Sequence, residues 1–362
     1  GAERVSSVLL NSFKEKGFET EYLLTNSNED EIINRDLDKD IPVTILRKSF
    51  VSESIFVRIF YKLLRIFTSL ICKMFESLHF SVPVSFSFLS FISEYRKEIR
   101  ALRNKLKAEP DTTVIAFLQP TIPIVLLAAR GLSNKVIISE RGDPKRIVKS
   151  RYGYKFIEKY YSRADAAVFQ TEDAKNTYPP DIAKKGYVIF NPIKNGLPEP
   201  YFGERRKSIV NFCRINPQKN LPLLLDAFEL FAESFPEYEL HIYGDASTEA
   251  DIQYFETVKE KRESLKSKDR VFFFPANRDI HRLIRDYSMF VSSSDFEGMS
   301  NSMLEALALG LPCVCTDCPA GGARAVIKDE ENGLLVPVND VVSLSDAMKR
   351  IISEKGLSEK LS

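Results

Sequence analysis

The sequence predicts an α/β protein built from two Rossmann-like, doubly wound domains that face a cleft. First, short apolar runs alternate with segments of helical spacing, which is typical of parallel sheets covered by helices. Second, 362 residues are enough for two domains of ordinary size. Third, a polar stretch at 195–208, "NGLPEPYFGERRKS", has the composition of a linker. We therefore expect domains at 1–197 and 198–362.

The second half shows the alternation most clearly. Helices are expected at 220–235, at the charged and exposed stretch 248–268, near 279–287 and after residue 300. Strands are expected at 208–215, 238–244, 271–277, 289–294 and 312–316. Because ligands of such sheets bind beyond the carboxyl ends of the strands, we look for functional residues in the loops that follow them.

The first half repeats this style less regularly. Its opening segment predicts a helix over 2–17 that stops at Gly17. Six short apolar runs are strand candidates, at 19–25, 43–47, 112–119, 135–140, 166–171 and 187–193.

Composition excludes some broad classes. The chain carries 51 Lys and Arg against 50 Asp and Glu, a balance that argues against a nucleic-acid partner. Five cysteines are too few for a disulfide framework, so we expect reduced thiols and a cytoplasmic protein. No signal peptide is visible, and because the chain begins at Gly1 without a methionine we expect its natural start further upstream.

The segment 54–80, "SIFVRIFYKLLRIFTSLICKMFESLHF", is apolar and basic at once. Arg58, Lys62, Arg65 and Lys73 predict a stripe of charge opposite six apolar residues, which are Ile59, Phe60, Leu63, Phe67, Leu70 and Met74. The segment is too interrupted to span a bilayer. It suits a helix in an anionic membrane interface, which would make the protein peripheral at the inner face of the cell membrane. The alternative is a core-packing helix with a solvated basic face, although the phenylalanines that follow at 80–92 favour the surface interpretation slightly.

Two glutamates stand out in "SSSDFEGMSNSMLEALALGLPCV" (292–314). Glu297 lies in a loop after a predicted strand, and Glu305 lies just inside the helix that follows. Gly298 allows close backbone approach to a ligand, and the free N–H groups of a helix start attract anions. Carboxylates that bind hydroxyl groups, beside a helix start that binds phosphate, suit a nucleotide sugar. The alternatives are a capping box in which Glu305 returns to Ser302, and a solvated loop acid at Glu297.

A second group of residues lies in "FCRINPQKN" (212–220). Arg214 follows a predicted strand and Lys219 precedes the next helix, so both cations are expected at one rim of the sheet, where they can neutralise a diphosphate. The alternative is incidental surface charge. Neither a Walker-type loop nor a G-x-G-x-x-G motif occurs, which argues against an ATPase or a dinucleotide-binding enzyme.

Two other chemistries are less favoured. The cysteines of "CVCTDC" (313–318) lack a nearby fourth ligand, so we expect structural thiols and no metal site. The histidines His79, His241 and His281 all lie outside "AFLQPTIP" (116–123), and His241 lies within a strand, where packing is its expected role.

Together these motifs resemble family 4 of the retaining glycosyltransferases, which have the GT-B fold. The resemblance is carried by "EGMSNSMLE", "ALALGLPCVCTD", "ENGLLVP", "CRINPQKNLPLLLDAF" and "LHIYGD" in the second half. In the first half "GAERVSSVLLNSFKEKGFETEYLLT", "ISERGDP", "ADAAVFQTEDAK" and "VIFNPI" are similar to bacterial members that build surface polysaccharides or lipid-linked oligosaccharides. It covers nearly the whole chain and is weakest over 28–110.

The resemblance implies an acceptor-side domain at 1–197 and a nucleotide-sugar-binding domain at 198–362. It implies that Glu297 holds donor-sugar hydroxyls and that Glu305 binds ribose. Arg214 and Lys219 would stabilise the departing diphosphate, and no metal or cofactor is expected. The remaining implied contacts to the donor come from Gly298, Met299, Ser300 and Asn301 at the helix start, from Asn277 near the base, and from Gly1 in the opening glycine turn.

The chain also departs from this family. Relatives carry a histidine where "AFLQPTIP" stands, so Gln119 or Thr121 is the expected substitute. Cys213 replaces a glycine beside the phosphate-binding arginine. Relatives begin with a strand and end with a helix that we expect to be missing here, the first from 1–197 and the second from 198–362.

The sequence thus predicts a glycosyltransferase that moves a hexose or N-acetylhexosamine from a nucleotide-diphosphate sugar, expected to be a UDP-sugar, to a lipid-linked or polysaccharide acceptor in bacterial surface glycan synthesis. One alternative is a nucleotide-sugar epimerase of the same fold, against which the scarcity of histidines argues. The other is a non-catalytic nucleotide-sugar-binding relative.

Overall fold

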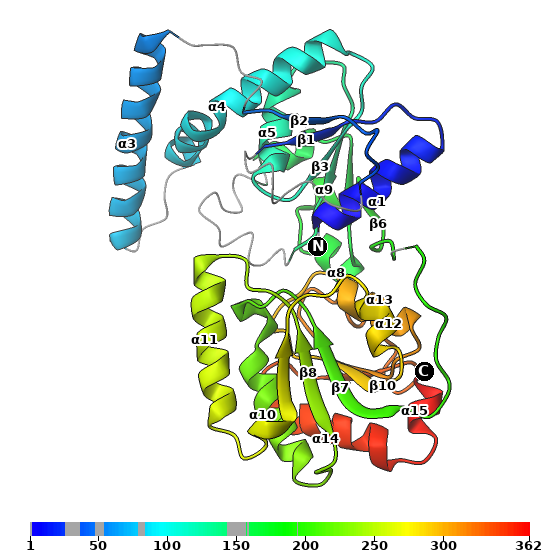
Figure 1. Cartoon of the computed structure of the whole chain (residues 1–362). Coiled ribbons are helices and arrows are strands. Elements are labelled where there is room, and N and C mark those ends of the chain that lie inside the picture. The colour runs from blue at the N-terminus through cyan, green and yellow to red at the C-terminus, as the bar shows by residue number, and fades with distance from the viewer. Residues whose placement is uncertain are drawn as a thin grey trace. The chain divides into compact units, whose positions relative to one another are not determined.

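A computed structural model describes residues 2–25, 37–47, 54–78, 84–142, 157, 159–193 and 195–362. The chain forms two compact units, Gly1–Pro192 and Ile193–Ser362, so the division lies five residues before the expected one. Each unit is a layered α/β structure (Figure 1).

The first unit begins with a helix and then alternates strands and helices. Its opening helix ends ahead of Gly17, whose φ of +84° suits the residue after a helix, as predicted. The main elements are α1 (Ala2–Glu15), β1 (Tyr22–Leu24), β2 (Val43–Ile45), α3 (Ile55–Ser77), α4 (Val84–Ala108), β3 (Val114–Phe117), α5 (Thr121–Ala128), β4 (Val136–Ser139), β5 (Ala166–Phe169), α8 (Glu172–Asn176), α9 (Pro180–Ala183) and β6 (Gly186–Val188).

All six strand candidates of the first half overlap a strand, but the strands form two sheets. The strands β1 and β2 pair in parallel with each other, and β3, β4, β5 and β6 form a second parallel sheet in that order. The predicted strand at 187–193 is shorter than expected, because pairing stops at Val188 and Ile189 and Phe190 are exposed.

The core of the first unit lies where α4 and α5 cover the four-stranded sheet. Phe91 of α4 is fully buried, and Leu102 and Leu106 of the same helix lie in this core with Ile122 and Ile124 of α5. Phe91 therefore lends no support to the surface interpretation of 54–80 that the phenylalanines of 80–92 favoured, because it packs in the core.

The second unit has six parallel strands with helices between them. Its elements are β7 (Arg206–Phe212), α10 (Leu221–Ala232), β8 (Glu239–Tyr243), α11 (Glu249–Glu263), β9 (Val271–Phe274), α12 (Ile280–Ile284), β10 (Tyr287–Ser292), α13 (Asn301–Ala308), β11 (Cys313–Thr316), β12 (Leu334–Val336), α14 (Val341–Ser353) and α15 (Leu357–Lys360). Every strand and helix predicted for 208–316 is present, although β7 begins two residues inside the expected linker.

The strand order of this sheet is β12-β11-β10-β7-β8-β9, which in order along the unit is the 3-2-1-4-5-6 arrangement of Rossmann sheets. Two apolar clusters cover its faces. One contains Leu224 and Phe228 of α10 with Met348 of α14, and the other contains Ile284 of α12 with Met303 of α13. This order puts β7 and β10 side by side at the centre.

Candidate functional site

The site is defined by the strand order of the second unit. From β7 the chain proceeds to β8 and β9 on one side, and from β10 it proceeds to β11 and β12 on the other. The loops after two such strands separate from each other, and the crevice at this switch point is where ligands of doubly wound sheets bind. The loop after β7 contains Arg214 and Lys219, and the loop after β10 contains Glu297.

Lys219 and Glu297 are in direct contact. The Nζ of Lys219 lies 2.6 Å from Oε2 of Glu297, and the two side chains are 15% and 20% exposed. Burial lowers the pKa of Lys219, but the adjacent carboxylate outweighs it and keeps that pKa above its usual value. The lysine is therefore a fixed cation at neutral pH, partly shielded from water, where a charge acts more strongly on a ligand than in bulk solvent.

Several polar side chains tie the two loops together around this pair. Gln218 donates through Nε2 to Oε2 of Glu297 at 3.0 Å and to the carbonyl of Phe296 at 2.9 Å. Asn220, in the left-handed region at φ +42°, caps α10 and donates to Asp295 at 2.6 Å. Ser293 donates to the carbonyl of Lys219 at 2.8 Å, so the loops form one connected structure.

Arg214 lies at the start of the β7 loop and is exposed. The amide of Asn216, oriented so that both of its polar atoms are satisfied, accepts from Nε and Nη2 of Arg214 at 3.1 and 2.9 Å. This contact fixes one edge of the guanidinium. Cys213, just before it, has its pKa raised to about 11 by burial, so it is a neutral packing residue and not a nucleophile.

Glu305 does not form the capping box that was the alternative interpretation of its position. The N-cap of α13 is Ser300, whose Oγ accepts from the N–H of Met303 at 3.4 Å, while Ser302 lies inside the helix. Glu305 is buried, and its Oε2 lies 2.7 Å from Nε2 of His281 on α12. The sequence analysis gave His281 no role, and the structure pairs it with a predicted site residue. The pair could not be predicted from the sequence, because the two residues are 24 positions apart and only the packing of α12 against α13 brings them together.

The loop at 298–301 is held closely by backbone. A Cβ on Gly322 would lie 1.5 Å from the carbonyl oxygen of Gly298, so only glycine fits at position 322. Met299 is buried in the apolar cluster beneath, and Asn301 is the first residue of α13. Gly322 therefore limits how the Gly298 loop can be placed, although no motif in the sequence had pointed to it.

Two predicted contacts remain, Asn277 and Gly1. Asn277 is exposed after β9, and its Oδ1 accepts from the N–H of Asp279 at 2.8 Å, which shapes a turn. Gly1 lies outside the described residues.

The cysteines and the strand histidine are packing residues. Cys313, Cys315 and Cys318 are buried free thiols, and burial raises the pKa of Cys318 to about 12. In the part of the chain that the structure describes, no three His, Cys, Asp or Glu side chains are grouped as metal ligands. His241 lies 2.7 Å from the hydroxyl of Tyr287 and is surrounded by aromatic rings, as its strand position predicted.

A polar cluster in the first unit was missed by sequence reasoning. Glu140, at the carboxyl end of β4, is buried and accepts from the hydroxyl of Tyr161 at 2.7 Å. Tyr161 in turn accepts from Gln119, which follows β3, at 3.1 Å. Burial raises the pKa of Glu140 to about 7, although hydrogen bonds from Tyr161 and Tyr178 oppose the rise.

Arg141, which follows Glu140, extends this cluster across the sheet. Arg141 donates to Ser139 at 2.9 Å and to Oδ1 of Asn191 at 2.7 Å, and Gln170 donates to the same oxygen at 2.8 Å. Adjacent opposite charges directly after an apolar strand, in "VIISER", were the available sequence signal. The first unit therefore also gathers polar groups at the carboxyl ends of its strands.

The raised pKa of Glu140 predicts that the stability of the protein decreases as pH rises. Its pKa is raised in the folded state from 4.5 to about 7, so its contribution to stability is full below pH 4.5 and is lost as pH rises to about 7. At 1.36 kcal/mol per pKa unit the loss is about 3 kcal/mol. Glutamine cannot ionise, so the free energy of unfolding of Glu140→Gln, measured with urea, should rise by that amount relative to the parent's between pH 4.5 and 7.5. Parallel pH profiles for the two proteins would contradict this.

Comparison with known proteins assigns the second unit to a family model. Residues 198–362 match the model described as glycosyl transferases group 1. The chain is 26% identical over 226 residues to the poly(glycerol-phosphate) alpha-glucosyltransferase of Bacillus subtilis, covering 61% of this chain and 32% of that protein. It is 29% identical over 169 residues to the UDP-Gal:alpha-D-GlcNAc-diphosphoundecaprenol alpha-1,3-galactosyltransferase of Escherichia coli, covering 46% and 42%. The matches thus span less than half the length of these relatives.

Solved structures define the fold. Anabaena HepE in complex with UDP and glucose aligns with a TM-score of 0.72 at 15% identity, covering 100% of this chain and 89% of that one. The lipopolysaccharide outer core galactosyltransferase WaaB, in its apo form, aligns with a TM-score of 0.63 at 18% identity, covering 100% and 90%. The chain therefore has the GT-B fold of these glycosyltransferases, and its second unit matches the model of glycosyl transferases group 1 over nearly its whole length.

Proposed function

We propose that the chain is a retaining glycosyltransferase. In this proposal it moves a hexose or N-acetylhexosamine from a UDP-sugar to a lipid-linked or polysaccharide acceptor in bacterial surface glycan synthesis. The observation that carries the proposal is the contact between Lys219 and Glu297 at the switch point of the second sheet, with Arg214 in the same loop as the lysine. The names of the two relatives above, one with a UDP-Gal donor and a lipid-diphosphate acceptor, support the substrate class.

The proposed reaction needs charge stabilisation of the departing diphosphate. The bond between the sugar C1 and the UDP oxygen breaks, the acceptor oxygen bonds to C1 on the same face, and the acceptor proton passes to a phosphate oxygen. Arg214 and Lys219 would stabilise the negative charge that develops on UDP. Glu297, which orients Lys219, would also accept hydrogen bonds from donor-sugar hydroxyls.

The other predicted residues have supporting roles in this proposal. Glu305 would reach the ribose, with His281 fixing its carboxylate. Backbone N–H groups at Gly298, Met299 and Ser300, and the side chain of Asn301, would contact the sugar or phosphate. Asn277 would lie near the base.

We also propose that no metal takes part, because two cations and a helix start supply the positive charge. Turnover is expected to be unchanged after exhaustive treatment with EDTA. Loss of turnover that Mg²⁺ or Mn²⁺ restores would overturn this part of the proposal.

The experiment that tests the function is a donor panel with product analysis. The full chain is incubated with UDP-glucose, UDP-galactose, the two UDP-N-acetylhexosamines and GDP-mannose, with a bacterial extract of lipid-diphosphate-linked glycans. We expect acceptor-dependent release of UDP, incorporation of the sugar with retained anomeric configuration, and about a 100-fold loss in Arg214→Ala.

Each alternative gives a different result in the same assay. Interconversion of UDP-sugars without transfer would identify an epimerase, for which the buried pair of His281 and Glu305 would be the candidate acid–base group. Saturable binding of UDP-sugar without any product would identify a non-catalytic binding protein. Either result would overturn the proposed transfer.

A further inference from the structure

The helix α3 presents a large apolar surface to solvent. Phe56 is 81% exposed, Leu63 is 61% exposed and Leu70 is 62% exposed. The other exposed apolar side chains of this segment are Ile55, Ile59, Phe60, Ile66, Phe67, Met74 and Leu78. A run of this kind along a whole helix marks an interaction surface, because isolated soluble domains rarely leave such patches uncovered.

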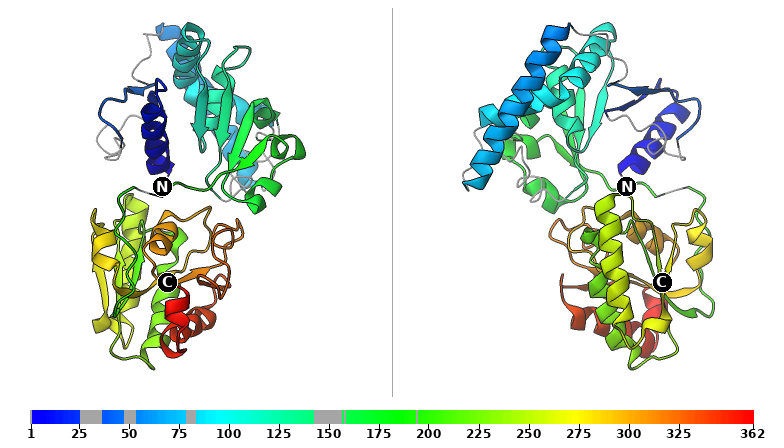
Figure 2. Two further views of the ribbon diagram at one scale, coloured as in Figure 1. Left: turned by 90° about the vertical axis from the view of Figure 1, so that its right-hand side faces the viewer. Right: turned by 60° about the vertical axis from the view of Figure 1, so that its left-hand side comes forward.

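The opposite face of α3 is the one that packs on the first unit. Thr68 and Cys72 are buried there, and the ring of Tyr61 lies 4.6 Å from the guanidinium carbon of Arg96 on α4. Figures 1 and 2 show α3 running beside α4 at the edge of the unit. The six apolar residues that the sequence placed opposite the charges are therefore exposed, which excludes a core-packing role for them.

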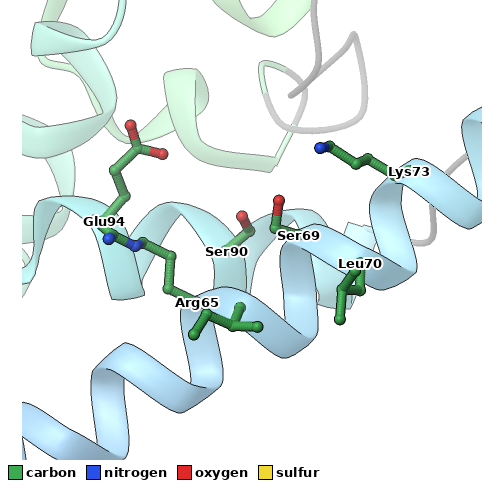
Figure 3. Close-up of a pocket in the computed structure, with 7 residues that line it drawn as sticks. Arg65, Ser69, Leu70, Lys73, Ser90 and Glu94 are labelled. Carbon is green, nitrogen blue, oxygen red and sulfur yellow. The ribbon is translucent and has the colours of Figure 1, made fainter.

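Four cations border this apolar surface. At 100° per residue, Arg58, Lys62, Arg65 and Lys73 fall on one strip, which adjoins one edge of the apolar face and lies across the helix from Phe67. Arg65 and Lys73 line a groove of about 400 Å³ between α3 and α4, together with Ser69 and Ser90, as Figure 3 shows. Glu94 of α4 also lines this groove, and the sequence of α3 itself contains one acidic residue, Glu76, in its last turn.

We propose that this face of α3 docks on the surface of an anionic phospholipid bilayer. The apolar side chains would enter the boundary between headgroups and acyl chains, and the strip of cations would contact lipid phosphates. None of the described helices is long and apolar enough to cross a membrane, so α3 would lie in the interface plane along its length of about 34 Å. A second copy of the chain is a poorer occupant, because pairing two such faces would bring like charges together.

The test is vesicle sedimentation with the full chain. We expect binding to vesicles of phosphatidylcholine with about 30% phosphatidylglycerol, weak binding to pure phosphatidylcholine, and a decrease as salt rises. Arg58→Gln, Lys62→Gln and Arg65→Gln together should weaken binding to anionic vesicles about 100-fold. The matched control removes three exposed lysines of the second unit, Lys207→Gln, Lys259→Gln and Lys268→Gln, and should bind like the parent.

A second variant tests the apolar contribution. Leu63→Ser, Phe67→Ser and Leu70→Ser should also release the protein from vesicles, with its circular dichroism and its affinity for UDP unchanged. Because UDP affinity reports the second unit, failure of vesicle binding is distinguishable from failure of the proposed function. Equal binding to both kinds of vesicle, no binding to either, or self-association that this variant abolishes would overturn the proposal.

Discussion

Replacing Lys219 with methionine is expected to lower kcat/KM for the donor at least about 100-fold. The change removes the cation that would stabilise the departing diphosphate, and loss of one such electrostatic contact costs about 100- to 1,000-fold. It also leaves the partly buried carboxylate of Glu297 without the ammonium that lies 2.6 Å away. The measurement is initial-rate kinetics of UDP release with the acceptor extract, alongside circular dichroism.

The matched control is Lys207→Met. Lys207 forms a pair with Glu237 at 3.4 Å, and both side chains are well exposed. Exposed pairs of this kind contribute little, so the variant should keep the parent's kcat/KM. Equal kinetics for Lys219→Met and Lys207→Met would show that the contact with Glu297 is structural only.

Gly322→Ala is expected to have the second large effect. The new Cβ would lie 1.5 Å from the carbonyl oxygen of Gly298, so one of two backbone segments must move. We expect a loss of about 3 kcal/mol in stability, which corresponds to roughly 6–12 °C in the melting temperature of the second unit. Because the displaced segment follows Glu297, turnover should also fall more than about 10-fold.

Gly356→Ala is the control that separates the effect of steric overlap from that of backbone strain. Gly356 has a φ of +79°, and no atom lies within 4 Å of the place that a Cβ would take, so alanine there costs about 1–2 kcal/mol through its conformation alone. This variant should melt somewhat lower than the parent and keep full turnover. A Gly322→Ala protein that behaves in the same way would contradict the proposed dependence of the site on that glycine.

Periodicity along the sequence was sufficient to predict most of the second unit. Apolar runs in β7, β8 and β10 are fully or mostly buried, and their spacing differs clearly from that of α10. The strand β12 and the helix α14 were not predicted, because "LLV" is only three residues long and α14 follows it with a mixed composition. A short strand is defined by its partner in the sheet more than by its own residues.

The candidate site was predicted in part. Strand ends placed Arg214, Lys219 and Glu297 at one rim, since parallel strands share that edge. Their contact distances, and the pair of Glu305 with His281, depend on side-chain directions and on how α12 packs, which no local pattern specifies. The start of α13 was left open between Ser300 and Ser302 because both serines fit a capping pattern, and the structure selects Ser300.

In the first unit the sequence could not predict which residues are buried. The helix α3 was correctly predicted from 54–80, but only the packing of α4 decides which of its faces is covered. Similarly, Glu140 is an ordinary charged residue in the sequence. Only the folded structure shows that it is buried and accepts a hydrogen bond from the hydroxyl of Tyr161.

The most direct test of the central claim is the affinity of the full chain for UDP, measured by isothermal titration calorimetry. We predict saturable binding that Arg214→Ala weakens at least about 10-fold, as loss of a charge-assisted contact requires. We also predict unchanged binding in Arg206→Ala, which removes an arginine at the opposite end of the same strand, where it pairs with Asp286. No binding of UDP, or equal affinity in the two variants, would contradict a diphosphate site at the switch point of the second sheet.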